Sequence, residues 1–322
     1  MTLDVASLAA TVGAAAHRLQ RLVVATPCVE SPWLAAATGA DVRCKLENVQ
    51  HTGSFKLRGA TNALLVMPEE RRARGVVAAS SGNHGLGLAA AAARLGVAAT
   101  VFVPNATPAA KVAAIARLGA EVHRHGDDCV VTEAHARGTA ERAGRAYVSP
   151  YNDLDVVAGQ GTVAVELARQ FADAEVVYVA LGGGGLIAGM AAYWKSLRPQ
   201  LEFVACSPVA SPAMQECVRQ GRIVDVPCFE TLSDSTAGGV EAGAVTFALC
   251  RDLVDRYIAV DEAAIAAALV GALEHQHLLV EGAAAVAIAA CLADRELRGR
   301  RAVVVVCGGN LPRATLERVL RG

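Results

Sequence analysis

Short apolar runs alternate along this chain with longer segments in which apolar residues recur at helical spacing. We predict strands over Asp41–Glu47, Val76–Ala79, Ala99–Val103, Glu121–Arg124, Tyr147–Ser149, Val176–Ala180, Glu202–Cys206 and Ala302–Cys307. We predict helices over 1–25, from His84 to Gly96, and over 108–118, 128–142, 158–171, 186–197, 261–276 and 282–293. Strands that alternate with helices run parallel and are covered on both faces. The pattern therefore predicts an α/β fold with open, mostly parallel sheets flanked by helices.

Composition supports a large buried core. The chain has 322 residues, of which 53% are hydrophobic and 19% charged, enough for one large domain or two lobes. Aromatic residues make up only 4%, so alanine and valine must supply most of the packing. A looser stretch from about 221 to 245, rich in Gly, Pro, Ser and Thr, is typical of a functional loop.

Charge and cysteine usage exclude several classes of function. The net charge is −1, from 30 basic and 31 acidic residues, so we expect no nucleic-acid partner. The apolar runs are too short to cross a membrane. The nine cysteines are scattered singly and form no Cys-x-x-Cys pair, which disfavours a thiolate zinc site. Without a basic, apolar leader at the N-terminus, we expect a soluble protein in the reducing cytoplasm.

One lysine stands in an apolar setting inside the stretch 48–60. Lys56 lies between Phe55 and Leu57, after Gly53 and Ser54, which predict a tight turn with Ser54 as the N-cap of a helix. Such a lysine is either a surface residue with a solvated ammonium group or an amine kept for chemistry. Burial would lower its pKa and make it a usable nucleophile.

Four consecutive glycines, Gly182 to Gly185, follow an apolar strand and precede a helix. Their backbone can approach a ligand closely, and the helix start adds unpaired N–H groups and a positive dipole end. The spacing fits neither a nucleotide-triphosphate loop nor a dinucleotide loop. A flexible connection is the alternative, but four glycines would lose much chain entropy on folding. We therefore predict a phosphate site.

A polar turn, Ser80-Ser81-Gly82-Asn83-His84-Gly85, follows the predicted strand 76–79 and opens a helix. Ligands of open α/β sheets bind at this carboxyl edge. The hydroxyl, amide and N–H groups suit a carboxylate and a ring oxygen, although an ordinary helix cap would have the same composition.

These motifs together resemble the threonine and serine dehydratases that use pyridoxal 5′-phosphate. The family's Ser-Phe-Lys-x-Arg-Gly-Ala string is complete from Ser54 to Ala60, and the Ser80–Gly85 turn, the four glycines and Cys307–Asn310 also match. The resemblance implies a two-lobed fold-type II enzyme with the cofactor between the lobes. The large lobe would comprise 1–59 and 149–322, and the small lobe 60–148.

The resemblance also implies roles for the cofactor-binding residues. Lys56 would bind the cofactor covalently, with Phe55 beside it, and Asn83 would hydrogen-bond its phenolic oxygen. The loop Gly182, Gly183, Gly184 and Gly185, with Leu186, would hold the phosphate. Cys307 would face the pyridine nitrogen, and this neutral partner makes the ring a weaker electron sink, which favours elimination over transamination.

The substrate carboxylate would bind to the loop Ser80, Ser81, Gly82, Asn83 and His84 by the same resemblance. Ser81 is the family position where serine racemases protonate the α-carbon. We interpret His84 as a structural residue of the helix start.

Three departures from the family pattern affect the expectations. Ser207 and Ala213 replace the carboxylates of the family's divalent-metal site, so we expect no metal there. The altered loop Thr231–Glu241 is similar to the hydroxyectoine-utilisation dehydratases. The chain ends at Gly322, which leaves no room for the regulatory domain of biosynthetic threonine dehydratases.

The expected function is removal of water from a 3-hydroxy amino acid, giving a 2-oxo acid and ammonia. Candidate substrates are threonine, serine and a hydroxyectoine-derived amino acid. An amino-acid racemase, a β-replacement synthase and a non-catalytic vitamin-B6-binding protein remain alternatives. The expected partners are a small amino-acid substrate and further copies of the chain, in a homodimer or another homo-oligomer.

Overall fold

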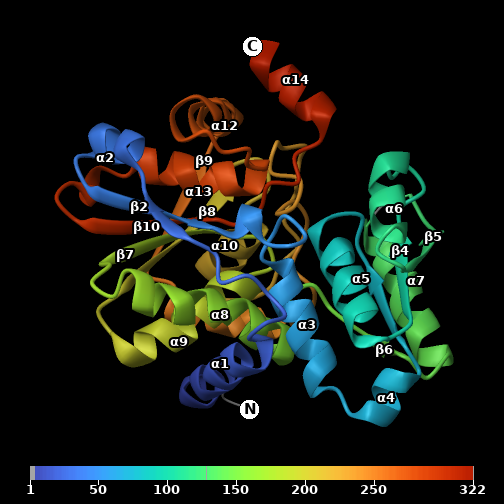
Figure 1. The fold of residues 1–322 in the computed structure, drawn as a ribbon. Coiled ribbons are helices and arrows are strands. Elements are labelled where there is room, and N and C mark those ends of the chain that lie inside the picture. The colour runs from blue at the N-terminus through green and yellow to red at the C-terminus, as the bar shows by residue number, and fades with distance from the viewer. Residues whose placement is uncertain (1–3, 128, 322) are drawn as a thin grey trace.

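The computed structural model describes residues 4–127 and 129–321, which build two β-sheets covered by helices (Figure 1). The larger sheet has the strand order β1-β2-β10-β7-β8-β9. Its strands are β1 (Cys28–Glu30), β2 (Asp41–Leu46), β7 (Val176–Ala180), β8 (Glu202–Pro208), β9 (Arg256–Val260) and β10 (Arg301–Val306). Only the edge strand β1 is antiparallel to its neighbour among these described strands. The predicted open, mostly parallel sheet is confirmed.

The smaller sheet is parallel throughout and has the order β5-β4-β3-β6. Its strands are β3 (Val76–Ala79), β4 (Ala99–Val103), β5 (Glu121–Arg124) and β6 (Ala146–Tyr147). All four lie inside the range 60–148 that we predicted for the small lobe. Helix α3 (Lys56–Val66) crosses the predicted boundary between 59 and 60, so this boundary remains a proposal.

Helices cover both sheets. Besides α3 they are α1 (Val5–Leu19), α2 (Pro32–Thr38), α4 (Glu69–Ala73), α5 (Asn83–Leu95), α6 (Ala109–Ala116), α7 (Cys129–Arg142), α8 (Leu154–Gln170), α9 (Gly185–Leu197), α10 (Ala213–Arg219), α11 (Val245–Leu253), α12 (Glu262–Gln276), α13 (Gly282–Ala293) and α14 (Arg313–Arg321). In Figure 1, α12 and α13 lie above the larger sheet, and α1, α8 and α9 lie below it. No helix in the described ranges is both long and apolar enough to cross a membrane.

Strand β3 of the smaller sheet is a continuous apolar run because helices cover both of its faces. Along β3, Val76 and Ala78 pack into one cluster with Leu88 of α5. Val77, between them, points to the opposite face and packs with Ala136 of α7. Because successive residues of a strand face opposite sides, helices on both faces require apolar residues at every position.

Local capping and edge pairing explain where the observed elements differ from the predicted ones. Helix α1 ends at Leu19 rather than residue 25, and Arg21 then takes a left-handed conformation at φ 69°. Helix α8 begins four residues before the predicted 158, because Asp153 caps it by accepting two backbone N–H groups. The elements β1, α2, α4, α10, α11, β9 and α14 were not predicted. Residues 1–3 and Asp128, which belong to predicted helices, lie outside the described residues.

The prediction that Ser54 caps the lysine helix is wrong. Phe55 is the N-cap of α3 and no side chain bonds to the cap. Ser54 instead forms an isolated β-bridge with Gly308, and its buried hydroxyl has no hydrogen-bond partner. The segment is fixed by the end of β10, since Phe55 N–H donates to the Cys307 carbonyl at 3.1 Å. The tight turn itself is present, with Gly53 at φ 70°.

Candidate active site

Two adjoining cavities lie at the carboxyl ends of strands from both sheets. Their volumes are about 50 and about 550 Å³, and Lys56, Asn83, Tyr151 and Glu281 line both of them. Every residue that we assigned to the site from sequence lines at least one of the two cavities: Phe55, Lys56, Ser80, Ser81, Gly82, Asn83, His84, Gly182, Gly183, Gly184, Gly185, Leu186 and Cys307. Motifs from four segments of the chain are thus brought to one place.

Lys56 is the first residue of α3 and points into the cavities. Its Nζ donates to the Pro150 carbonyl at 2.9 Å and lies 5.2 Å from the centroid of the Phe55 ring. Burial lowers the pKa of Lys56 to about 8, and the nearby Cys307 and Glu281 oppose this shift. A lysine with this pKa is partly neutral near physiological pH, so its nitrogen is available as a nucleophile and base.

The four glycines connect β7 to α9 and line the smaller cavity. A Cβ on Gly183 would lie 2.3 Å from the Tyr151 ring, and one on Gly184 would lie 2.6 Å from Cys250 Sγ. Gly184 also has φ 84°, which side chains rarely adopt. Packing therefore requires glycine at Gly183 and Gly184. The start of α9 can donate unpaired N–H groups to an anion, worth about 0.3–1 kcal/mol for the dipole alone.

The polar turn after β3 forms a second set of donors. Gly82 N–H donates to Ser80 Oγ at 3.2 Å, which shapes the turn, and Ser81 lines the larger cavity. Gly82 is the N-cap of α5, whose first residue is Asn83. The first N–H groups of a helix have no partner within it, so this turn can bind a carboxylate.

His84 points away from this donor set and toward the smaller sheet. Its buried Nε2 lies 2.9 Å from the Val148 carbonyl and can only donate to it. Burial, with a smaller effect of Lys56, lowers the pKa of His84 to about 3. His84 is therefore neutral at physiological pH and holds the start of α5 against the segment after β6. We retain its structural role as a proposal.

Cys307 follows β10 directly and lines the smaller cavity. The side chain is buried, and burial raises the pKa of the thiol well above its ordinary value. The site thus contains a neutral thiol close to Lys56, rather than a thiolate.

Glu281 is a central residue of the site that we did not assign from sequence. It is the N-cap of α13 but makes no capping bond, because its carboxylate accepts from Asn83 Nδ2 at 2.8 and 2.9 Å. Ser235 Oγ donates to the same carboxylate at 3.1 Å, and the Asn310 backbone N–H donates at 3.3 Å. An acidic residue at a helix start has the composition of an ordinary cap, so its residue type alone did not indicate that it faces the cavity.

Tyr151 is a second residue that sequence reasoning missed. Its ring lies against Gly183, and its hydroxyl accepts from the Glu241 backbone N–H at 2.9 Å. It therefore connects the glycine loop to the loop Thr231–Glu241. In the sequence, the hint that Tyr151 belongs to the site was its aromatic side chain directly after Pro150.

Two ion pairs join the loop Thr231–Glu241 to helices of the smaller sheet. Lys111 of α6 pairs with Asp234 at 3.1 Å, and Arg137 of α7 pairs with Glu241 at 2.7 Å. Both pairs are partly exposed, and they hold the loop over the larger cavity, which Asp234 lines.

The metal position of the resembling family contains Ser207 and Ala213, both buried, at the end of β8 and the start of α10. Within residues 4–127 and 129–321, no group of three or more His, Cys, Asp or Glu side chains is placed to hold a metal ion. The absence of a metal requirement remains a prediction.

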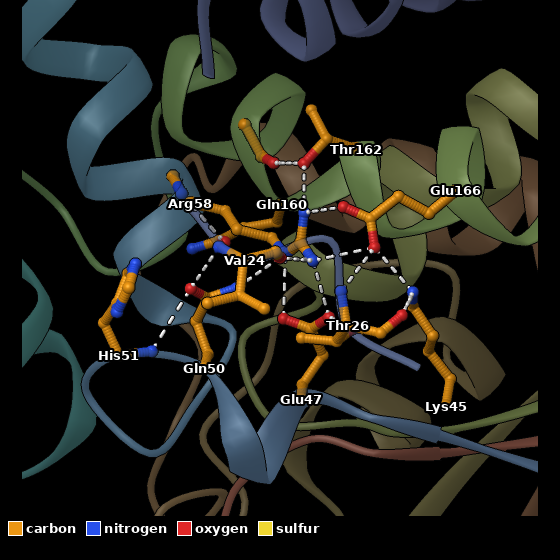
Figure 2. Close-up of polar contacts among 12 residues, drawn as sticks. Val24, Thr26, Lys45, Glu47, Gln50, His51, Arg58, Gln160, Thr162 and Glu166 are labelled. Atoms are coloured by element: carbon orange, nitrogen blue, oxygen red, sulfur yellow. Dashed lines mark hydrogen bonds and ion pairs between the residues drawn. The ribbon is translucent and has the colours of Figure 1, made fainter. Parts of the chain in front are cut away.

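Behind the lysine helix lies a buried ionic cluster, which we call the Arg58 cluster: Lys45, Glu47, Arg58 and Glu166 (Figure 2). Arg58 donates to both oxygens of Glu47 at 2.7 Å and to those of Glu166 at 2.6 and 3.1 Å. Lys45 pairs with Glu166 at 2.5 Å. The cluster joins β2, α3 and α8, and so fixes the first turn of the helix that begins with Lys56.

Comparisons with known proteins agree with this arrangement. Residues 19–308 match the family model described as pyridoxal-phosphate dependent enzyme. The chain is 38% identical to L-threonine ammonia-lyase of Thermotoga maritima over 308 residues, which cover 95% of this chain and 76% of that protein.

Two solved structures have the same fold. Processed threonine deaminase isoform 2 from Solanum lycopersicum matches with a TM-score of 0.94 and 30% identity, over 100% of this chain and 88% of that chain. Maize serine racemase matches with a TM-score of 0.90 and 30% identity, over 97% of this chain and 96% of that chain.

Proposed function

Since the chain belongs to the family of pyridoxal-phosphate dependent enzymes, we propose that it removes water from a 3-hydroxy amino acid. The products would be a 2-oxo acid and ammonia. The predicted enzyme class, a pyridoxal-phosphate-dependent lyase, agrees with ammonia-lyase and dehydratase relatives that are 33–40% identical over most of the chain. The substrate and the choice between elimination and racemisation are the parts that we propose.

The residues in the cavities fit pyridoxal 5′-phosphate. Lys56 supplies an amine of lowered pKa, and the glycine loop, which lines the same cavity, leads into the start of α9 with its unpaired N–H groups. The neutral thiol of Cys307 and the amide of Asn83 line the same small cavity as Lys56. We propose that Lys56 binds the cofactor, that Gly182–Gly185 hold its phosphate, and that Cys307 faces its ring nitrogen.

When bound, the cofactor makes the α-hydrogen of an attached amino acid acidic by withdrawing electrons. The turn from Ser80 to His84 would bind the substrate carboxylate with its free N–H groups. Lys56 would accept the α-proton on its neutral Nζ, which a pKa of about 8 permits near neutral pH. The protein surface around the cavity would keep bulk water away from the reacting carbon.

The observation that carries this proposal is the lysine of lowered pKa beside a phosphate cradle and a neutral thiol. Its test is purification of wild type and Lys56→Ala. The wild type should bind the cofactor covalently, absorb in the visible range and release ammonia and a 2-oxo acid from a hydroxy amino acid. Lys56→Ala should lose the absorption and at least about 10²-fold of the activity. A variant that keeps the band, with borohydride labelling another lysine, would disprove the assignment.

For the substrate, we propose a hydroxylated diaminobutyrate-type compound beside threonine and serine, with hydroxyaspartate lower. The larger cavity has room for a polar extension, and the hydroxyl residues Ser235 and Thr236 of the altered loop line it. The experiment compares specificity constants of wild type and Ser235→Gly for these amino acids. A specificity constant for threonine far above all the others, with no change in Ser235→Gly, would contradict a role of the altered loop in substrate choice.

Racemisation is the second candidate, because Ser81 lines the larger cavity and the maize serine racemase structure is similar. We expect elimination to be faster, since the neutral Cys307 disfavours a long-lived carbanion. Chiral analysis of serine recovered during turnover tests this ranking. Inversion faster than 2-oxo-acid release would reverse it.

We also propose a cytoplasmic homo-oligomer, a dimer or larger. The similarity to bacterial L-threonine ammonia-lyases supports the cytoplasmic location. Light scattering of the purified protein would give the oligomeric state.

A further inference from the structure

Asn83 is held from both ends of its carboxamide by other side chains. Its Nδ2 donates to Glu281, and its Oδ1 accepts from Asn310 Nδ2 at 2.7 Å. Asn310 Nδ2 also donates to the Thr52 carbonyl at 2.9 Å, which determines the orientation of the Asn310 amide. Since a carbonyl and a carboxylate can only accept, this chain of bonds has one possible direction.

The geometry leaves one N–H of Asn83 unused. The Nδ2 atom lies 2.8 and 2.9 Å from the two oxygens of Glu281. The two N–H bonds of an amide diverge too widely to reach both oxygens of one carboxylate, so a single N–H is shared between them. The second N–H remains available in the small cavity that Asn83 and Lys56 line.

Glu281 holds the N–H end of this amide, and Asn310 holds its oxygen end. With the Glu281 carboxylate removed, the Asn310 bond would be the one of these two restraints left to oppose a rotation of the Asn83 oxygen into the cavity. That rotation would replace a donor by an acceptor opposite an oxygen of the cofactor, which costs binding free energy.

We propose that Glu281 is a positioning residue that holds the Asn83 carboxamide with an N–H turned into the cavity, where it donates to the ring oxygen of the cofactor. This inference rests on the proposed cofactor site. In this role Glu281 contacts neither the substrate nor the cofactor.

The charge state of Glu281 adds a pH dependence. Burial raises the pKa of Glu281, and the hydrogen bonds from Asn83, Ser235 and Asn310 oppose the shift. The titratable groups that face it are Asp234 from the loop, Lys56 from α3 and Cys307 after β10. Once protonated, Glu281 loses part of its capacity to accept from Asn83. Cofactor affinity should therefore fall as the pH drops through the raised pKa of Glu281.

The experiment measures the dissociation constant of pyridoxal phosphate for the apo-protein, with no substrate present. Glu281→Ala should weaken binding by about the same factor as Asn83→Ala, roughly 5- to 150-fold for one lost oriented bond. The double variant should be no weaker than the single ones, because both remove the same interaction. Glu281→Gln keeps an acceptor, so it should bind better than Glu281→Ala and lack the pH step of the wild type.

The matched control is Glu262→Gln. Glu262 is the first residue of α12 and accepts from the Leu232 N–H at 2.7 Å. It therefore holds the loop Thr231–Glu241, from which Ser235 contacts Glu281, but does so from outside the cavities. We expect the Glu262→Gln apo-protein to bind pyridoxal phosphate with the same affinity as the wild type. The melting temperature of each apo-protein shows whether a variant is folded.

Additive losses in the double variant, or unchanged affinity in a folded Glu281→Ala, would overturn the inference. Failure of the proposed cofactor site itself would give a different result, because Lys56→Ala would then keep the visible absorption of the wild type.

Discussion

The two buried polar clusters on either side of the lysine helix differ in how completely their charges are satisfied. In the Arg58 cluster, two cations and two carboxylates bind one another directly, and Glu47, Arg58 and Lys45 are fully buried. In the second cluster, which we call the Glu281 cluster and define as Lys56, Asn83, Glu281 and Cys307, no ion pair joins the lysine to the carboxylate among the described contacts.

The pKa values express the same difference. Burial alone would raise the pKa of Glu47, but Arg58 reverses the effect and lowers it. For Glu281 the hydrogen bonds from neutral groups do not offset burial, and its pKa is raised. For Lys56, burial likewise prevails. For the carboxylates, complete ion pairing keeps Glu47 charged beside the helix that it fixes, whereas incomplete pairing keeps Glu281 titratable where chemistry is proposed.

The largest effect should come from breaking the Arg58 cluster. Arg58→Met leaves two carboxylates with only Lys45 in a buried site, and we expect a loss of about 3–5 kcal/mol in the free energy of unfolding. Urea unfolding of the apo-protein measures it. Arg58→Lys should lose less, since it keeps the charge but not the paired bonds. If Glu281→Gln proves as destabilising as Arg58→Met, the contrast between the clusters is wrong.

The two carboxylates should give opposite pH dependences of stability. The lowered pKa of Glu47 contributes stability that is present above its unfolded pKa, near 4.5, and is lost as the pH falls through the folded pKa. The raised pKa of Glu281 contributes stability that is present below about 4.5 and is lost as the pH rises through the folded pKa. The free energy of unfolding of wild type minus Glu47→Gln should thus rise with pH, and that of wild type minus Glu281→Gln should fall. Slopes of equal sign would contradict the comparison.

A smaller effect is expected at the exposed pair of Lys111 and Asp234. Partly exposed ion pairs contribute about 0.2–1 kcal/mol and are screened by salt. A double-mutant cycle with Lys111→Ala and Asp234→Ala should give a coupling in this range that declines at high salt. A coupling as large as the one between Arg58 and Glu47 would mean that exposure does not distinguish these pairs.

The smallest effect should follow metal removal. Ser207 and Ala213 provide no carboxylate for a divalent ion at the metal position of the resembling family. Extensive chelation should leave activity and melting temperature nearly unchanged. A large drop that magnesium or calcium restores would show that a cation is needed.

Much of the site was readable before the fold was known. Lys56, Asn83, the glycine loop and Cys307 lie in contiguous motifs, and each motif follows or precedes a strand at an edge where parallel strands place ligands. Glu281, Tyr151 and Asn310 were not assigned, because their functions depend on partners 198, 90 and 227 positions away in the chain.

The amino-acid sequence by itself determined the parallel sheets, since these depend on periodicity, and it placed the candidate lysine and the glycine loop in recognisable motifs. Only the tertiary structure decided that Ser54 pairs with Gly308 instead of capping a helix, and that Glu281 turns from its own helix to Asn83. It likewise decided that Lys45 pairs with Glu166, whereas Lys56 pairs with no carboxylate among the described contacts. Burial lowers the pKa of both lysines, and burial and charge partners are properties of the packed protein.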